Sequence, residues 1–240
     1  MLHFLISTLI RQEGLGFFNK IISDESERFY FPASQILFYN ALQFDITYKK
    51  AYFTFPILEN FVYSFYFDTI YGLGLGYKFN KIDVGFNGFY IGDKINFNVG
   101  SNFSIFDKHQ IKLSVGYIKD SFEIRGFFKI ASFEQASFRF YGEYRNTFNG
   151  ILAISYEPTI YRFLTFGISN IDTTFYAFSN VEFFIYREYL MLRGGVWQNL
   201  KTKDYNMIYG FSVSYNNIRG DFIINEKEFK IGIYYAFKIF

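Results

Sequence analysis

The chain has 240 residues, with 24 Lys and Arg against 22 Asp and Glu, so its formal net charge is only +2. This balance lacks the clustered basic excess of nucleic-acid-binding proteins, and a content of 50% hydrophobic and 25% aromatic residues excludes general disorder. Because the chain has no cysteine, disulfide scaffolds and thiolate metal sites are excluded. The length suits one folded domain, and no motif predicts a cofactor.

The first ten residues are apolar but carry no basic n-region and no small-x-small cleavage site. Residues 1–10 are therefore either the remnant of a secretory signal or a first strand. No stretch reaches 18 consecutive apolar residues, so we expect no membrane-spanning helix.

From about residue 41 onward, apolar residues alternate with polar or small ones at a period of two, which indicates β-strands. Successive side chains of a strand point to opposite faces, so each strand has one apolar face and one polar or small face. The clearest examples are residues 42–48, 95–105, 111–117, 138–145, 209–215 and 229–239.

The breaks between these segments are short and polar, which predicts hairpin turns in an antiparallel meander. At about 14 residues per strand and turn, the 200 residues 41–240 would form about 14 strands, and we accept any even number from 12 to 16. The predicted turns are 92–94, 107–109, 119–120, 146–150 and 225–228.

Two architectures accommodate so many alternating strands: a soluble all-β protein and a transmembrane β-barrel. The unbroken apolar faces are long and the opposite faces are rich in Gly, Ser and Asn, which favours a barrel in the outer membrane of a Gram-negative-type bacterium, in contact with lipid. A soluble protein with so aromatic a surface would aggregate. Aromatic residues also stand near segment ends, where interfacial girdles lie: Phe79, Tyr90, Tyr117, Tyr144, Tyr156 and Tyr215.

Charged residues fall on the polar faces of several predicted strands, so barrel closure would gather them in the lumen. Buried charges require partners. Either they form a structural salt-bridge network, or they line a polar gate that selects solutes. The predicted lumen network is Glu123, Arg125, Arg139, Glu143, Glu182, Arg193, Arg219 and Asp221.

Catalytic and metal-binding candidates are scarce. The only histidines are His3 and His109, and His109 stands in a predicted turn. No cluster of ligands has metal-site spacing, and no nucleophile has a histidine placed to activate it. We therefore expect no metal site and no enzymatic activity.

Both ends of the chain carry recognisable motifs. Near the N-terminus these are Gly14-Leu15-Gly16 and Tyr30-Phe31-Pro32-Ala33, and towards the C-terminus they are the segments 181–183, 190–196, 209–215 and 219–222, with Phe240 as a terminal aromatic residue. In these segments the chain resembles the FadL-type and PorV/PorQ-like group of outer-membrane barrels, with Phe31 in the position of an Asn in the opening motif of that group.

This resemblance implies a barrel of 14 strands with an N-terminal hatch in its lumen. The hatch would comprise residues 11–40, including Gly14, Gly16, Pro32 and Ala33, ahead of the barrel at 41–240. FadL-type members pass hydrophobic molecules through the barrel wall, whereas PorV-like members hold cargo of a secretion system.

We therefore expect a monomeric outer-membrane barrel that passes small hydrophobic solutes. The alternative is a non-transporting barrel that acts as a secretion-system partner, with a secreted protein as cargo, or as a structural component. The chain is too short for long extracellular loops under either hypothesis.

Overall fold

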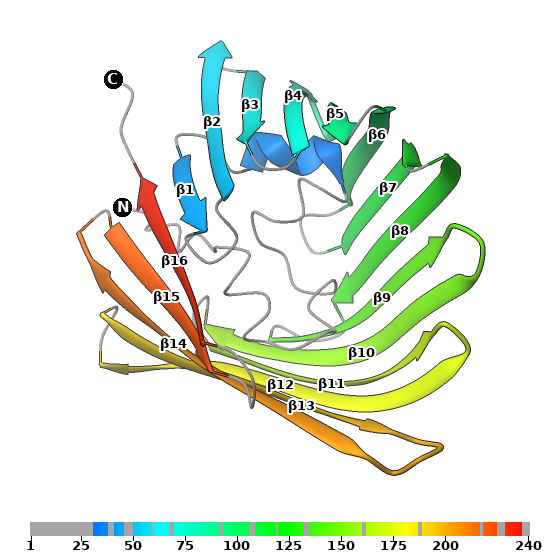
Figure 1. Cartoon of the computed structure of the whole chain (residues 1–240), viewed down its shortest axis with the longest axis vertical. Coiled ribbons are helices and arrows are strands. Elements are labelled where there is room, and N and C mark those ends of the chain that lie inside the picture. Colours follow the sequence, from blue (N-terminus) through cyan, green and yellow to red (C-terminus); the bar gives the residue numbers. More distant parts are fainter. Residues whose placement is uncertain are drawn as a thin grey trace.

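The computed structural model describes residues 31–37, 41–45, 50–58, 60–67, 70–91, 94–105, 109–118, 120–131, 135–159, 162–186, 189–216, 218–224 and 229–236. Within these ranges, sixteen antiparallel strands each pair with their neighbours in sequence, and β1 pairs with β16 to close the barrel (Figure 1). The protein is an all-β barrel, as predicted.

The first half of the wall comprises β1 (Ala41–Asp45), β2 (Lys50–Leu58), β3 (Phe61–Phe67), β4 (Ile70–Phe79), β5 (Ile82–Ile91), β6 (Lys94–Ile105), β7 (His109–Ile118) and β8 (Ser121–Ala131). The second half comprises β9 (Ala136–Tyr144), β10 (Phe148–Thr159), β11 (Arg162–Ile171), β12 (Thr174–Tyr186), β13 (Leu190–Asn199), β14 (Tyr205–Tyr215), β15 (Ile218–Ile224) and β16 (Phe229–Ala236).

The number of strands, sixteen, equals the upper limit of the predicted range and exceeds the expected number of about 14 by two. The estimate of about 14 strands assumed longer connections than the structure has. The longest connection between successive strands comprises only residues 200–204. The shortness of the connections agrees with the expectation that long loops are absent. The resemblance to the FadL-type group implied 14 strands, and the observed sixteen depart from that number.

The described part of the chain contains one short 3₁₀ helix, η2 (Pro32–Leu37), which lies inside the ring against β3, β4, β5 and β6 (Figure 1). No helix among the described residues is long and apolar enough to cross a membrane.

Short turns at both ends of the barrel use residues that tolerate a left-handed backbone. Asn80, Asp120, Asp172 and Asn216 each have a positive φ, between 45° and 64°. Asn and Asp adopt this conformation at low cost because their short polar side chains hydrogen-bond to nearby backbone groups. The turn that was predicted at 146–150 is shorter than expected, since β10 already begins at Phe148.

Two prolines mark irregularities in the strand pairing. The register shifts between Pro56 and Leu58 in β2, and between Tyr156 and Thr159 in β10, a span that contains Pro158. Proline lacks the N–H that a ladder needs, so a bulge is the position in a strand where its presence costs least.

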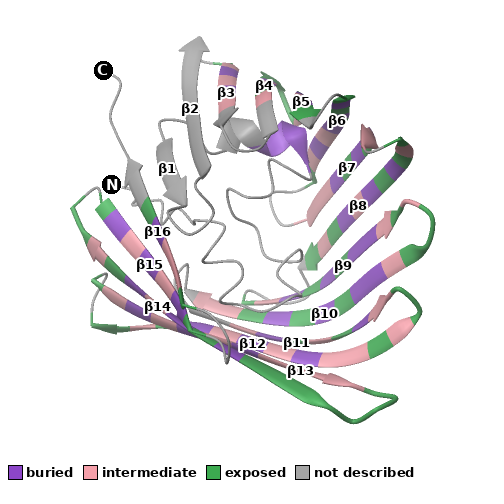
Figure 2. Ribbon diagram, viewed as in Figure 1, coloured by how far each residue is buried: buried purple, intermediate pink, exposed green. Residues whose placement is uncertain are grey.

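Burial alternates along the strands and defines an outer and an inner face (Figure 2). Among the side chains described for β3–β16, the outward face carries no Asp, Glu, Lys or Arg. On β16, Ile233 is exposed and Gly232 is buried, in agreement with the predicted lipid and lumen assignments. An uncharged apolar exterior is what a bilayer requires of a barrel wall.

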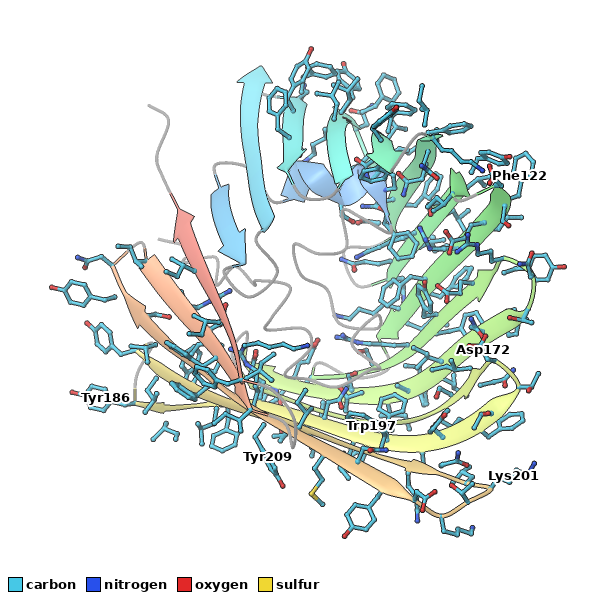
Figure 3. All side chains as sticks on the ribbon, viewed as in Figure 1. Phe122, Asp172, Tyr186, Trp197, Lys201 and Tyr209 are labelled. Atoms are coloured by element: carbon cyan, nitrogen blue, oxygen red, sulfur yellow. The ribbon has the colours of Figure 1, made fainter. Side chains whose placement is uncertain are left out.

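Aromatic side chains extend outward near the strand ends, as predicted for an interfacial girdle. Phe79, Tyr144 and Tyr215 are each the last residue of a strand and are strongly exposed. Figure 3 shows Phe122, Tyr186 and Tyr209 pointing away from the barrel, whereas Trp197 lies on the inner side of the wall.

Candidate functional site on the luminal wall

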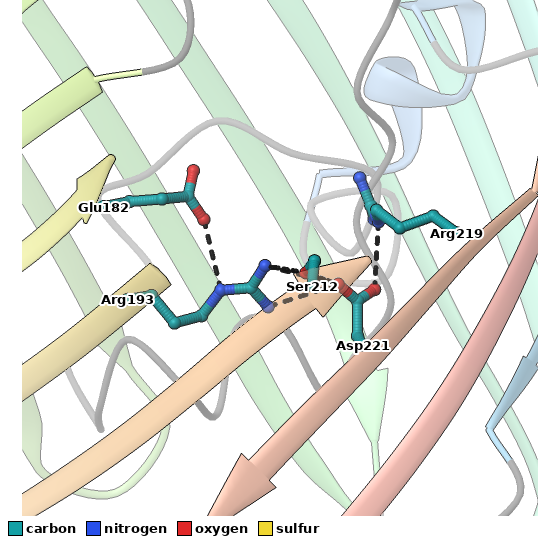
Figure 4. Close-up of polar contacts among 5 residues, drawn as sticks. All are labelled: Glu182, Arg193, Ser212, Arg219 and Asp221. Atoms are coloured by element: carbon teal, nitrogen blue, oxygen red, sulfur yellow. Dashed lines mark hydrogen bonds and ion pairs between the residues drawn. The ribbon is translucent and has the colours of Figure 1, made fainter. Parts of the chain in front are cut away.

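Four strands, β12 to β15, carry a network of buried charges on the inner wall (Figure 4). Arg193 lies between two carboxylates, with its Nε 3.4 Å from Glu182 Oε2 and its Nη2 3.3 Å from Asp221 Oδ1. Arg219 Nε donates to Asp221 Oδ2 at 3.1 Å. Ser212 bridges the group, because its hydroxyl donates to Asp221 and accepts from Arg193. We call these five residues the β12–β15 network.

The strand register explains why these residues meet. Glu182 stands directly opposite Arg193 across the β12–β13 pair, and Ser212 stands opposite Asp221 across the β14–β15 pair. The two carboxylates balance the two guanidinium groups, so the network has no formal net charge. Asp221 is 0% exposed, and a buried charge of this kind is stable only with its partners in place.

A second charged group lies near the start of β8. Arg125 contacts Glu123 through a short ion pair, and its Nε lies 3.9 Å from Glu143 Oε2. Glu143 also accepts hydrogen bonds from the Tyr141 hydroxyl at 2.5 Å and from Asn149 Nδ2 at 3.2 Å. This arrangement fixes the Glu143 carboxylate on the inner wall.

A third group lies towards the opposite ends of the same strands. Glu157 contacts Arg139 in a short ion pair and Lys129 at 3.2 Å. Arg139 Nε also donates to Ser137 Oγ at 3.2 Å. Glu157 was not among the predicted network residues, and it is the residue through which Arg139 joins a cluster.

The eight predicted network residues all belong to inward-facing positions, but the ion pairs between described residues divide them into these three groups rather than one. The sequence could not show the division, because it depends on which strands lie side by side.

An apolar patch lies on the inner wall, between the second and third charged groups along β8 and β9. It consists of inward side chains of β8, β9, β10 and β12, together with Phe31 from the segment before the barrel. We call it the luminal patch: Phe31, Phe127, Tyr141, Ile151, Ala153 and Phe178, with Ile171, Tyr176 and Trp197 packed against it. Trp197 also packs against Ile208 and Ile223, which extends the apolar surface to β14 and β15.

Sequence reasoning missed the luminal patch, although a signal for it exists. An inward apolar residue stands beside an outward one in the chain and breaks the alternation. Phe127-Phe128, Ile151-Leu152 and Ile223-Ile224 are such pairs, and in each the first member is buried and the second is exposed. Two consecutive apolar residues in an otherwise alternating strand are therefore a signal for an apolar part of the lumen.

Residues 31–34 pack against the inner wall. The Phe31 ring makes edge contacts with Phe127 and Tyr141, at centroid distances of 6.5 and 6.2 Å. Asn102 Nδ2 donates to Ser34 Oγ at 3.1 Å. All four residues are buried.

Pro32 packs closely against β5 and β6 at two positions where these strands have glycine and therefore no side chain. A Cβ at Gly85 would lie 2.2 Å from the Pro32 carbonyl carbon, and a Cβ at Gly100 would lie 3.0 Å from Pro32 Cδ. Of the predicted hatch residues, Pro32 and Ala33 are thus placed inside the barrel, while Gly14 and Gly16 lie outside the described residues.

No group of three potential metal ligands occurs among the described ranges. His109 was predicted to lie in a turn, but it is the first residue of β7 and pairs with Ile105. The connection between β6 and β7 comprises residues 106–108, so it lies one residue earlier in the chain than the predicted turn 107–109.

Comparisons with known proteins support the architecture. A "bacterial polysaccharide outer membrane secretin" superimposes with a TM-score of 0.52 at 11% identity, covering 82% of this chain and 97% of that one. A substituted Rh. blastica porin superimposes with a TM-score of 0.53 at 8% identity, covering 82% and 96%. No family model and no curated protein matches the chain.

The fold is that of an outer-membrane β-barrel. At such low sequence identity the likeness establishes the fold alone, so membership of the FadL-type or PorV/PorQ-like group stays a prediction.

Proposed function

We propose that this protein is an outer-membrane barrel that passes small hydrophobic solutes. The observation that carries the proposal is the luminal patch. Barrels that conduct water-soluble molecules have polar interiors, whereas here six buried apolar side chains form one cluster on the inner wall. An apolar solute gains free energy by leaving water for such a surface, at roughly 25 cal/mol per Å² of apolar area buried.

Phe31 contributes an apolar ring to this cluster from outside the barrel strands. Its ring packs where an aromatic solute would find the same neighbours, so a solute can compete with Phe31 for the patch. The charged groups on either side are internally paired, and in this proposal they stiffen the wall rather than select ions. The protein works as a monomer surrounded by lipid, because each barrel contains a complete patch.

Uptake by intact cells tests this proposal, since apolar solutes cross simple lipid vesicles without help. Cells that display the protein in their outer membrane should accumulate the fluorescent apolar dye N-phenyl-1-naphthylamine several-fold faster than cells without it. Ile151→Thr, within the luminal patch, should remove most of the gain. Met191→Thr is the matched control, because Met191 is equally buried on the inner wall but lies outside the cluster.

Equal uptake with and without the protein would contradict transport. It would leave the non-transporting alternative, a secretion-system partner that holds a secreted protein or a structural barrel. The burial of so many inward side chains favours that alternative, because an open channel would leave them accessible to water. Planar-bilayer recordings distinguish the two further: a steady conductance after refolding would contradict a permanently closed barrel.

A further inference from the structure

Asn180 lies on the inner face of β12, beside the luminal patch and next to Phe178 along the same face. Its side chain is 1% exposed, yet neither its Oδ1 nor its Nδ2 makes a hydrogen bond with any residue that the structure describes. A buried amide without partners costs several kcal/mol relative to one in water. Such a group is retained at low cost only if something else pairs with it.

The neighbours of Asn180 leave it available to a ligand. On β11 it stands opposite Thr165, whose hydroxyl already hydrogen-bonds to Ser155 at 2.9 Å. On β13 it stands opposite Gly195, which has no side chain to offer. Along β12, Glu182 is engaged by Arg193. The strand register thus surrounds the amide with groups that are occupied or absent.

An aromatic surface lies next to Asn180 on the inner wall. Phe178 pairs with Trp197 across β12 and β13, and both belong to or pack against the luminal patch. The Phe178 ring lies over Gly167, where a Cβ would come within 2.5 Å of the ring. A polar amide therefore adjoins an aromatic surface on one stretch of the inner wall.

We infer that Asn180, Phe178 and Trp197 form a recognition site for an amphipathic solute, with an aromatic or aliphatic body and a neutral head group that both donates and accepts hydrogen bonds. This rests on the proposed function and specifies its substrate class. The amide offers one acceptor and one donor group, so a carboxamide or a similar head satisfies both. An ionised carboxylate is disfavoured, because the Arg193 guanidinium group on the neighbouring strand is already paired with Glu182 and Asp221, and a lone buried charge is costly.

Trp197 is the only tryptophan of the chain, so its fluorescence reports binding at this position. The probes are 4-phenylbutanamide and 5-phenylpentan-2-one, which have the same shape but differ in that the ketone cannot donate. The refolded full-length protein in detergent should bind the amide about tenfold more tightly than the ketone, the effect of one buried hydrogen bond.

Asn180→Leu should abolish this preference, so that both probes bind alike. The variant is expected to fold, because it replaces an unpaired polar group by an apolar one of similar size, and heat-modifiable migration on gels checks this. Thr165→Val is the control: it changes the neighbouring hydroxyl, which is already paired, and should keep the preference for the amide.

The two proposals fail in different ways. If the unsubstituted protein binds both probes equally, or if Asn180→Leu keeps the preference for the amide, the role of Asn180 is refuted while the apolar patch still binds solutes. If neither probe changes the fluorescence of Trp197, the patch holds no solute, and the proposed function falls together with the recognition site.

Discussion

Neutralising Asp221 should destabilise the folded barrel by about 3 kcal/mol, at the lower end of the range for breaking a buried ion pair. Asp221 is 0% exposed and faces two guanidinium groups, with Arg193 at 3.3 Å and Arg219 at 3.1 Å. Asp221→Asn keeps the shape and one acceptor oxygen. It leaves the β12–β15 network with two positive groups and the single carboxylate of Glu182.

The measurement is the free energy of unfolding in urea with lipid vesicles, followed by the emission of Trp197. The matched control is Asp120→Asn, which neutralises an ion pair with Lys94 whose side chains are 55% and 60% exposed. That change should cost less than about 1 kcal/mol, because water screens exposed pairs.

A double substitution sharpens the test. Arg219→Gln together with Asp221→Asn restores a neutral network, so the pair should be more stable than Asp221→Asn alone. If Asp221→Asn costs less than about 0.5 kcal/mol, or no more than Asp120→Asn, the network is accessible to water and the argument from burial is wrong.

Three further predictions concern the wall and its exterior. Ile233→Arg should cost about 2–4 kcal/mol of folding free energy in lipid, because Ile233 faces hydrocarbon, whereas Gly232→Ser on the luminal side should cost less. If urea titrations gave the reverse order, the assignment of the two faces of β16 would be wrong by one residue. Gly85→Ala should displace residues 31–34, since its Cβ would lie 2.2 Å from Pro32. Limited proteolysis should then cut near Pro32 faster than in the control Gly88→Ala, in which the nearest atom to the added Cβ belongs to the Phe86 ring, 3.4 Å away. Expressed without detergent, the protein should form inclusion bodies and refold in detergent to a heat-modifiable, strand-rich form; a monodisperse species free of detergent would contradict a membrane-facing exterior.

The periodicity of the chain was sufficient to predict the barrel and the faces of its strands. Alternation is a local property, because successive side chains of a strand point to opposite faces of the sheet. Ile233 and Gly232 on β16, and the outward Tyr144 and Tyr215, are therefore placed as the pattern indicated. The strand number was less well determined, because it depends on turn lengths, and the short Asn- and Asp-containing turns allowed sixteen strands where about 14 were expected.

What the tertiary structure alone decided is which inward residues meet. The register of four strands brings Glu182, Arg193 and Asp221 into one network, while Arg139 pairs with Glu157 in a separate group. Phe31 packs against Phe127 and Tyr141 although about a hundred residues separate them, and Asn180 lies buried without a hydrogen-bond partner among the described residues. Each of these contacts depends on the register between neighbouring strands or on how the interior is packed. A pattern of period two specifies the face on which a side chain lies, but not its neighbour across the sheet or across the lumen.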